Sequence, residues 1–260
     1  MSALQTVSSS LGDPSALRIY LAEARNELRR LARTPSFAAP SLAFPLVFYV
    51  LFGIVLPGSE GRATPLLVSY CVFGVMGPAL FGFGVGLALE RQQGWLELKR
   101  VSPMPTGAYF FAKIATSAVF ASAVIASLSV TGVVFGGVEL GALAWLRLVG
   151  TLLLGTLPFC ALGLLIGAVV RGQAAVAVVN LVYLPMSVLS GLWMPLEIFP
   201  PIVQRFAVLW PAWHLSQLAS SAIGLENDGR FLAHVGVLVA MTAVFLSLAA
   251  TRLRTLGGGR

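Results

Sequence analysis

The chain has 260 residues, of which 57% are hydrophobic and only 10% are charged, and its mean hydropathy is +0.88. A water-soluble domain of this length could not cover so much apolar surface, so the composition excludes a soluble protein and predicts an integral membrane protein. The net charge of +7 is spread over separate loops, which favours a role in membrane orientation over nucleic-acid binding.

The amino end divides into two parts. Residues 1–12 are rich in serine and are expected to be disordered, and residues 13–35 predict an amphipathic helix on the cytoplasmic surface. Its apolar residues recur every three or four positions and its arginines fall on the other side, which is typical of a helix lying in the membrane interface near anionic headgroups. The sequence leaves open whether this helix is only an anchor or also flanks a contact with a partner protein.

Six apolar runs follow, each long enough to cross ~30 Å of hydrocarbon as a helix. They predict an all-α membrane domain over residues 36–250, with spans at about residues 37–56, 65–89, 107–135, 148–170, 174–195 and 231–250. Small residues four apart, which allow helices to approach closely, occur at Gly82/Gly86, Gly132/Gly136 and Gly163/Gly167.

The spans contain almost no ionisable side chains. Lys113 and His234 lie near span ends, and Asn180 is the only amide well inside. A carrier driven by an ion gradient normally keeps charged groups near mid-membrane to bind the coupling ion. We therefore expect this chain to draw its energy from elsewhere.

Basic residues indicate the orientation, because cytoplasmic loops carry an excess of Lys and Arg. With the amino end inside, only Arg62, Arg147, Arg205 and Arg230 of the 17 basic residues lie outside. This assignment predicts cytoplasmic termini, with residues 251–260 as a cytoplasmic tail.

A polar segment interrupts the apolar runs at residues 90–106 and must leave the hydrocarbon. Gly94 permits the chain to bend out of the span, and Pro103 and Pro105 stop a short helix before the chain re-enters the bilayer. Leu96 and Leu98 give that short helix an apolar face. The segment therefore predicts a site at which the protein holds a soluble partner.

A long connection at residues 196–230, rich in proline and aromatic residues, cannot be regular membrane helix. Val203, Phe206, Ala207 and Trp210 lie at helical spacing, and the tryptophans suit the interfacial aromatic belt. The connection predicts short helices in the outer leaflet.

No catalytic centre emerges from the sequence. The chain has no Gly-Lys dipeptide and hence no phosphate-cradling loop of its own. Ser190 with His214 or His234 could suggest an intramembrane serine protease, but Val188 stands where that pattern requires glycine. We expect no catalytic residue, no metal site and no cofactor in this chain.

The polar segment resembles the loop between the second and third spans of type-2 ABC exporter permeases, where a short helix docks in a groove of a separate ATPase subunit. The family pattern is Glu-Arg, two variable residues, Gly, a variable residue, Leu, then Pro, and a Lys ten residues after that Pro. The chain keeps the spacing, but Trp95 replaces the commoner threonine and Lys99 and Arg100 replace residues that many members keep apolar. The resemblance implies an ATPase-coupling site at Glu90, Arg91, Gly94, Leu96, Glu97, Leu98, Pro103 and Lys113.

The connection at residues 196–230 resembles the same family's outer re-entrant hairpin, which caps the export path. Together with the helical spacing, this resemblance implies an outer gate at Pro195, Pro200, Phe206, Trp210, Pro211 and His214.

The resemblance as a whole implies the transmembrane permease of an ATP-driven exporter in a bacterial plasma (inner) membrane, whose cargo is a drug, a lipid or a lipid-linked glycan. Its partners would be two copies of an ATPase subunit, which bind ATP and Mg²⁺, a second permease copy or a paralogue, and membrane lipids, with no nucleic acid. Two alternatives are an ion-coupled secondary carrier and a sensor or assembly subunit that binds the ATPase without transport.

Overall fold

The computed structural model describes residues 16–56, 61–95, 104–225 and 229–257, and every regular element in these ranges is a helix. The first half contains α2 (Ala16–Ala32), α3 (Pro35–Val50) with a π-helical extension η1 (Leu51–Val55), α4 (Ala63–Gln92) and α6 (Thr106–Phe135). The second half contains α7 (Ala142–Leu154), α8 (Leu157–Val169), α9 (Ala174–Leu189), the short turn η2 (Leu196–Ile198), α10 (Pro201–Ala207), α11 (Pro211–Ala222) and α12 (Phe231–Gly257). The predicted all-α membrane fold is confirmed.

Five helical stretches of the described chain are long and apolar enough to cross a membrane. They are Phe37–Val55, Ala63–Gln92, Thr106–Phe135, Ala142–Val169 and Phe231–Thr255. The run expected at residues 174–195 forms α9, which has 16 residues, fewer than the ~20 that a 30 Å hydrocarbon core requires. Helix α9 ends there because Gly191 adopts a φ of +75° and the chain turns toward η2. Helix length thus supports five spans and one shorter apolar helix.

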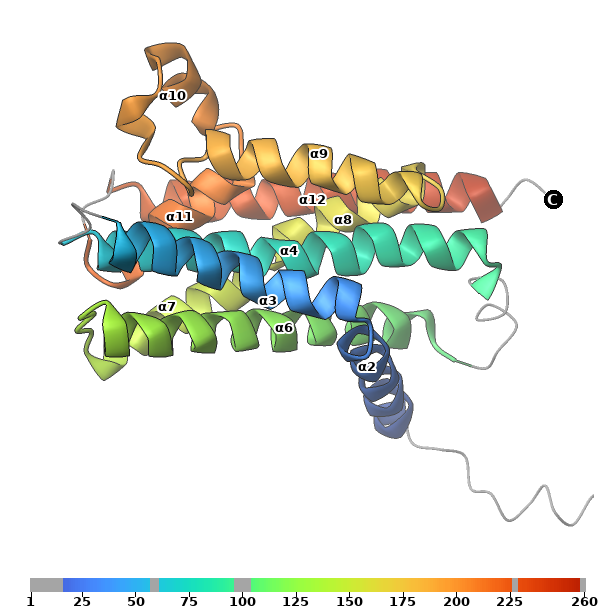
Figure 1. The fold of residues 1–260 in the computed structure, drawn as a ribbon. Helices are drawn as coiled ribbons and strands as arrows, with labels where there is room; N and C mark the ends of the chain where they lie inside the picture. Colours follow the sequence, from blue (N-terminus) through green and yellow to red (C-terminus); the bar gives the residue numbers. More distant parts are fainter. Residues whose placement is uncertain (1–15, 57–60, 96–103, 226–228, 258–260) are drawn as a thin grey trace, which may run out of the picture.

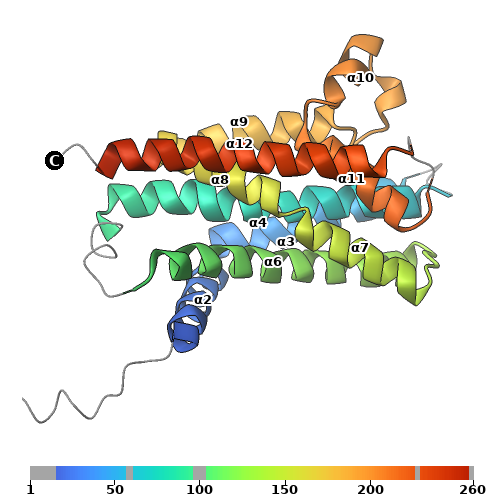
Figure 2. The ribbon, with the colours of Figure 1, turned by 180° about the vertical axis from the view of Figure 1, so that it is seen from behind.

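Helix α4 runs through the middle of the bundle and contacts α3, α6, α8, α9 and α11 (Figure 1). It is largely buried, whereas α12 is mostly exposed and packs against α8 and α11, as the view from behind shows (Figure 2). Because apolar exposed residues suit a lipid environment, this distribution is typical of a central helix surrounded by lipid-facing ones.

The two ends of the bundle differ. Helix α4 ends and α6 begins at one end, where α2 runs away from the bundle at a steep angle and the carboxyl end of α12 also lies (Figure 1). We call this the loop end. Helix α10 projects from the opposite end, which we call the hairpin end.

Glycines allow α4 and α8 to pack backbone against backbone. A Cβ atom at Gly163 would lie 2.9 Å from the carbonyl oxygen of Leu80, and one at Gly167 would lie 2.8 Å from that of Gly84. Such distances leave no room for a side chain, so the predicted close approach is confirmed for this pair. The other two glycine pairs lie against side chains of neighbouring helices. For example, a Cβ atom at Gly132 would lie 2.9 Å from the hydroxyl of Tyr49 on α3.

Candidate functional site

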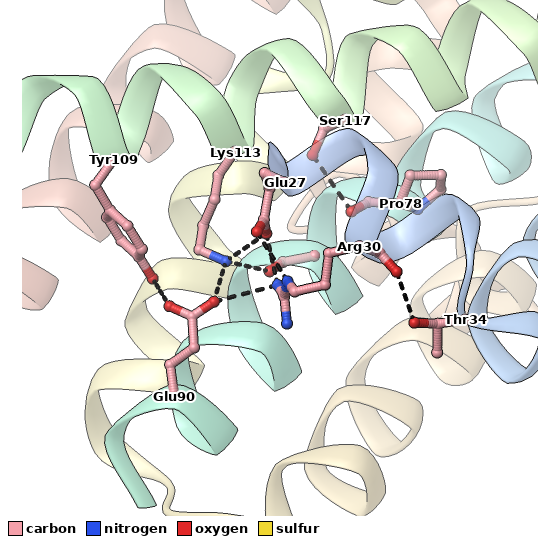
Figure 3. Close-up of polar contacts among 9 residues, drawn as sticks. Glu27, Arg30, Thr34, Pro78, Glu90, Tyr109, Lys113 and Ser117 are labelled. Carbon is pink, nitrogen blue, oxygen red and sulfur yellow. Dashed lines mark hydrogen bonds and ion pairs between the residues drawn. The ribbon is translucent and has the colours of Figure 1, made fainter. Parts of the chain in front are cut away.

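A group of polar side chains, most of them charged and buried, joins three helices at the loop end (Figure 3). It consists of Glu27 and Arg30 on α2, Glu90 on α4, and Tyr109 and Lys113 on α6, and we call it the charge cluster. Only 6% of Glu27, 7% of Glu90 and 2% of Lys113 is exposed. Charged residues are almost never buried this deeply unless they are paired. The burial of these side chains therefore depends on ion pairs and hydrogen bonds within the cluster.

Lys113 is the centre of the charge cluster. Its Nζ donates to Glu27 Oε1 at 2.9 Å and to Glu90 Oε1 at 3.1 Å. Arg30 donates to both oxygens of Glu27, from Nε at 2.9 Å and from Nη2 at 2.6 Å, and its Nη2 lies 3.2 Å from Glu90 Oε1. The Tyr109 hydroxyl donates to Glu90 Oε2 at 2.7 Å. Each carboxylate therefore contacts both cations.

Electrostatics keep Glu27 ionised. Burial acts to raise the pKa of Glu27, but the charges of Lys113 and Arg30 and the hydrogen bonds from both outweigh burial and lower that pKa from 4.5 to about 2. Two carboxylates and two cations leave no net charge. A buried, balanced and hydrogen-bonded set is tolerated, whereas the loss of one member leaves a buried charge unpaired at a cost of about 3–5 kcal/mol.

Gly86 on α4 makes room for the lysine. A Cβ atom at Gly86 would lie 3.1 Å from Lys113 Nζ, so a side chain there would compete with the lysine for this space. Gly82 contributes its carbonyl oxygen, which accepts from Lys113 Nζ at 3.4 Å, and a Cβ atom at Gly82 would lie 3.5 Å from Ser117 Oγ, an ordinary contact. Gly86 thus allows a long cation from α6 to reach across α4 toward α2.

Arg91 lies beside Glu90 in the sequence but faces a different helix. Its Nη1 donates to the carbonyl oxygens of Gly167 at 2.6 Å and Ala168 at 2.7 Å. These carbonyls belong to the last turn of α8. Carbonyl groups in a last turn have no hydrogen-bond donor within their own helix. The Glu90–Arg91 pair consequently ties the end of α4 to α2 and α6 on one side and to α8 on the other.

The chain leaves α4 through Gly94, which has a φ of +75°. Only glycine adopts this conformation routinely, and it is the usual way to end a helix sharply. Pro105 precedes α6 with an extended ψ of 134°. The predicted coupling residues Leu96, Glu97, Leu98 and Pro103 lie outside the described residues, and their role stays a prediction.

The residues predicted for the outer gate lie at the hairpin end. Pro195 and Pro200 precede η2 and α10, and the side chain of Phe206 on α10 is 55% exposed. Trp210 and Pro211 begin α11 instead of continuing α10, because the proline restricts Trp210 to an extended conformation, with φ −97° and ψ 129°. The gating role of this hairpin stays a prediction.

His214 is buried and connects three segments of the hairpin end. Its Nε2 lies 2.8 Å from the carbonyl oxygen of Val208, and its Nδ1 lies 2.8 Å from Nδ1 of His234 on α12. Since a carbonyl can only accept, Nε2 of His214 carries the proton, and a neutral His214 must accept from His234 through Nδ1. This pair anchors α11 and the turn after α10 to the start of α12.

A cavity of about 470 Å³ lies between α3, α4 and α9. Its lining is mainly aromatic and contains Ser41 and Asn180 as polar side chains. The aromatic residues are Phe37, Phe44, Phe48, Phe73, Phe81, Tyr183 and Trp193. Its size falls within the range of small-molecule sites, which are predominantly apolar with a few polar groups.

Sequence reasoning missed Glu27, Arg30 and Tyr109 as members of a site. Two signals could have pointed to it. Lys113 stands directly before an apolar run that begins at Ile114, so a buried partner of opposite charge is required. Glu27 stands directly before Leu28 on the apolar side of its helix, where a carboxylate needs a cation.

Comparisons with known proteins find similarity over most of the chain. The sequence model of a family described as ABC-2 type transporter matches residues 20–223, a range that includes the residues of the charge cluster, those of the aromatic cavity and most of residues 196–230. A protein of Bacillus subtilis (strain 168) that carries the provisional name of transport permease YvfS is 29% identical over 227 residues. That alignment covers 85% of this chain and 91% of the Bacillus protein.

Proposed function

We propose that this chain, which belongs to the ABC-2 type transporter family and is a multi-pass membrane permease of an ABC transporter, is an exporter. It moves a hydrophobic or amphipathic cargo outward across a bacterial plasma membrane. A separate ATPase subunit binds ATP and Mg²⁺ and supplies the energy. Two copies of that ATPase bind two permease chains, which are identical or paralogous.

The charge cluster is the observation that carries the proposal. It lies close to the place where the segment between α4 and α6 leaves and re-enters the bundle, because Glu90 is in the last turn of α4 and Tyr109 and Lys113 are in the first two turns of α6. A force applied to that segment by the ATPase would act on α2, α4 and α6 together, since ion pairs join them. Arg91 would pass part of the same displacement to α8.

The aromatic cavity supports a hydrophobic cargo. It is bounded by α4, the helix whose end lies in the charge cluster, so a shift of α4 would change the shape of the cavity. Phe44 and Leu184 on its rim are 57% and 42% exposed, which leaves the cavity open to the surface of the bundle. Because this rim is apolar and exposed, it favours entry of the cargo from the membrane.

The energy source is tested with the permease co-expressed with its ATPase in inside-out vesicles. A panel of fluorescent amphipaths, including Hoechst 33342 and NBD-phosphatidylethanolamine, is offered from outside with and without ATP. Accumulation should require ATP and should persist when a protonophore and a sodium ionophore are present. Accumulation that the ionophores abolish would instead identify an ion-coupled carrier.

Filling the aromatic cavity should block the same transport. Gly77 lines it, and a Cβ atom there would lie 3.5 Å from the Tyr183 hydroxyl, an ordinary contact. Gly77→Leu should slow ATP-dependent accumulation roughly tenfold or more, because added methylenes against a fitted ligand cost about 1–3 kcal/mol. Gly77→Ala is the control and should transport almost normally. Equal transport by both variants would exclude this cavity from the cargo path.

The proposed orientation places the loop end in the cytoplasm, because most basic residues gather there. In intact cells, a membrane-impermeant maleimide should label a cysteine placed at Arg230 and should reach one at Arg252 only after permeabilisation. The native cysteines, Cys71 and Cys160, are buried and serve as the background control. Labelling of position 252 in intact cells would reverse the orientation.

A further inference from the structure

Helix α2 presents three faces, and only one of them contacts the bundle. Tyr20 and Glu27 lie on the contacting face, where the Tyr20 ring packs at 5.6 Å from that of Phe111 on α6. Leu17 and Leu21 lie on a second face and are 67% and 54% exposed. The third face carries arginines in a single row.

We call the exposed side chains of Arg18, Arg25 and Arg29 the arginine row. Their spacings of seven and four residues place them on one side of a helix with 3.6 residues per turn. By the same geometry, the row lies next to the exposed leucines. Helix α2 therefore offers a cationic stripe beside an apolar one.

This pairing of faces identifies the ligand as an anionic phospholipid of the bilayer. Exposed leucines gain from contact with acyl chains, and arginines beside them lie at the depth of the headgroup phosphates. The acidic surface of a protein would satisfy the arginines but would leave Leu17 and Leu21 in water. A free phosphate would leave them there as well.

The arginine row is linked to the charge cluster through one turn of helix. Arg25 and Arg29 flank Glu27 in the sequence, and Arg30 follows at once. The carbonyl oxygen of Arg30 also accepts from Thr34 Oγ1 at 2.8 Å, which ties the end of α2 to the start of α3. A lipid that fixes the row thus also fixes the two cluster residues that α2 contributes.

We infer that anionic phospholipid bound along the arginine row holds α2 in place and stabilises the charge cluster, so that bilayer charge regulates coupling. The link to coupling rests on the proposed function, whereas lipid binding and its effect on the cluster do not. Neutral lipid alone leaves α2 held only by its contacts with the bundle.

Lipid preference is measured first, on the full chain in nanodiscs. A bimane label on Ala22→Cys, an exposed position on α2, is quenched by nitroxide-labelled phosphatidylglycerol or phosphatidylcholine at equal mole fraction. Phosphatidylglycerol should quench more strongly. Arg25→Gln with Arg29→Gln should remove this preference, with a loss on the order of fivefold in lipid affinity for each arginine.

Arg252→Gln with Arg254→Gln removes two exposed arginines from α12 at the loop end of the bundle and should keep the preference. Equal quenching by the two lipids in the unmodified chain would overturn the inference. So would a preference that both double variants lose equally, because the arginine row would then have no special part in it.

The effect on the charge cluster is measured as the melting temperature of the unlabelled chain in nanodiscs. Adding phosphatidylglycerol to phosphatidylcholine should raise it in the unmodified chain and in Arg252→Gln with Arg254→Gln, but not in Arg25→Gln with Arg29→Gln. The rise should shrink in Lys113→Met, or in Tyr109→Phe if the first variant does not fold, because the cluster is then incomplete.

An unchanged rise in the cluster variant would show that the lipid binds without acting on the cluster, and it would overturn the regulatory inference. Failure of the proposed function gives a different result. In that case the lipid measurements come out as expected, while cargo accumulation does not require ATP and is abolished by the ionophores.

Discussion

Lys113→Met should abolish export while the chain still holds its ATPase. Lys113 bonds to both carboxylates of the charge cluster, so its loss leaves Glu27 and Glu90 buried with Arg30, whose side chain is 45% exposed, as the remaining cation. An uncompensated buried charge costs about 3–5 kcal/mol. We expect α2 to separate from α4 and α6, and transport per ATP hydrolysed to fall on the order of a hundredfold or more.

The measurement is the ratio of cargo accumulated to ATP hydrolysed in inside-out vesicles, with the amount of inserted permease determined in parallel. The segment between α4 and α6 is unchanged in this variant, so the ATPase should co-purify as before. Arg254→Gln removes a cation from α12 at the loop end of the bundle and is the matched control, with a ratio close to that of the unmodified chain.

A second variant separates a loss of folding from a loss of coupling. Lys113→Met with Glu90→Gln leaves Glu27 and Arg30 as a balanced pair, which should restore stability and insertion. Export should remain low, because no ion pair then joins α2 to α4. Normal transport by this double variant would show that the charge cluster only stabilises the fold.

The sequence predicted the all-α membrane fold well because apolar length is a strong physical signal. The sequence was a less reliable guide to where each helix begins and ends, because backbone geometry decides those positions. The expected span at residues 148–170 belongs to a longer stretch, Ala142–Val169, in which α7 ends at Leu154 and α8 begins at Leu157. The expected helical register from Val203 to Trp210 is interrupted, since Trp210 before a proline turns extended.

The contacts within the charge cluster could not be predicted from the sequence, for a different reason. Glu27 and Lys113 are 86 positions apart, and no periodicity within a helix reveals which distant carboxylate a buried lysine will meet. Glu90 and Lys113 were predicted to act with the ATPase on the strength of the family resemblance. Their contact with each other and with α2 is a tertiary feature that only the packed bundle supplies.

Leu96→Asp with Leu98→Asp should detach the ATPase. If residues 90–106 form the coupling loop, these leucines supply its apolar face and enter a groove of the ATPase. A buried unpaired carboxylate costs several kcal/mol, and a few buried side chains carry most of the energy of a typical interface. The variant should insert normally, because neither leucine belongs to a span, but the ATPase should be lost on co-purification and export should stop.

The matched control places the same two charges at the hairpin end. Ile202 and Leu209 are 64% and 59% exposed, so Ile202→Asp with Leu209→Asp adds two carboxylates far from the loop end and should retain the ATPase. The charge cluster is intact in both variants, so α2, α4 and α6 stay joined. A difference in ATPase retention would therefore come from the position of the new charges. Full retention of the ATPase by Leu96→Asp with Leu98→Asp would place the energy-coupling contact elsewhere on the loop end.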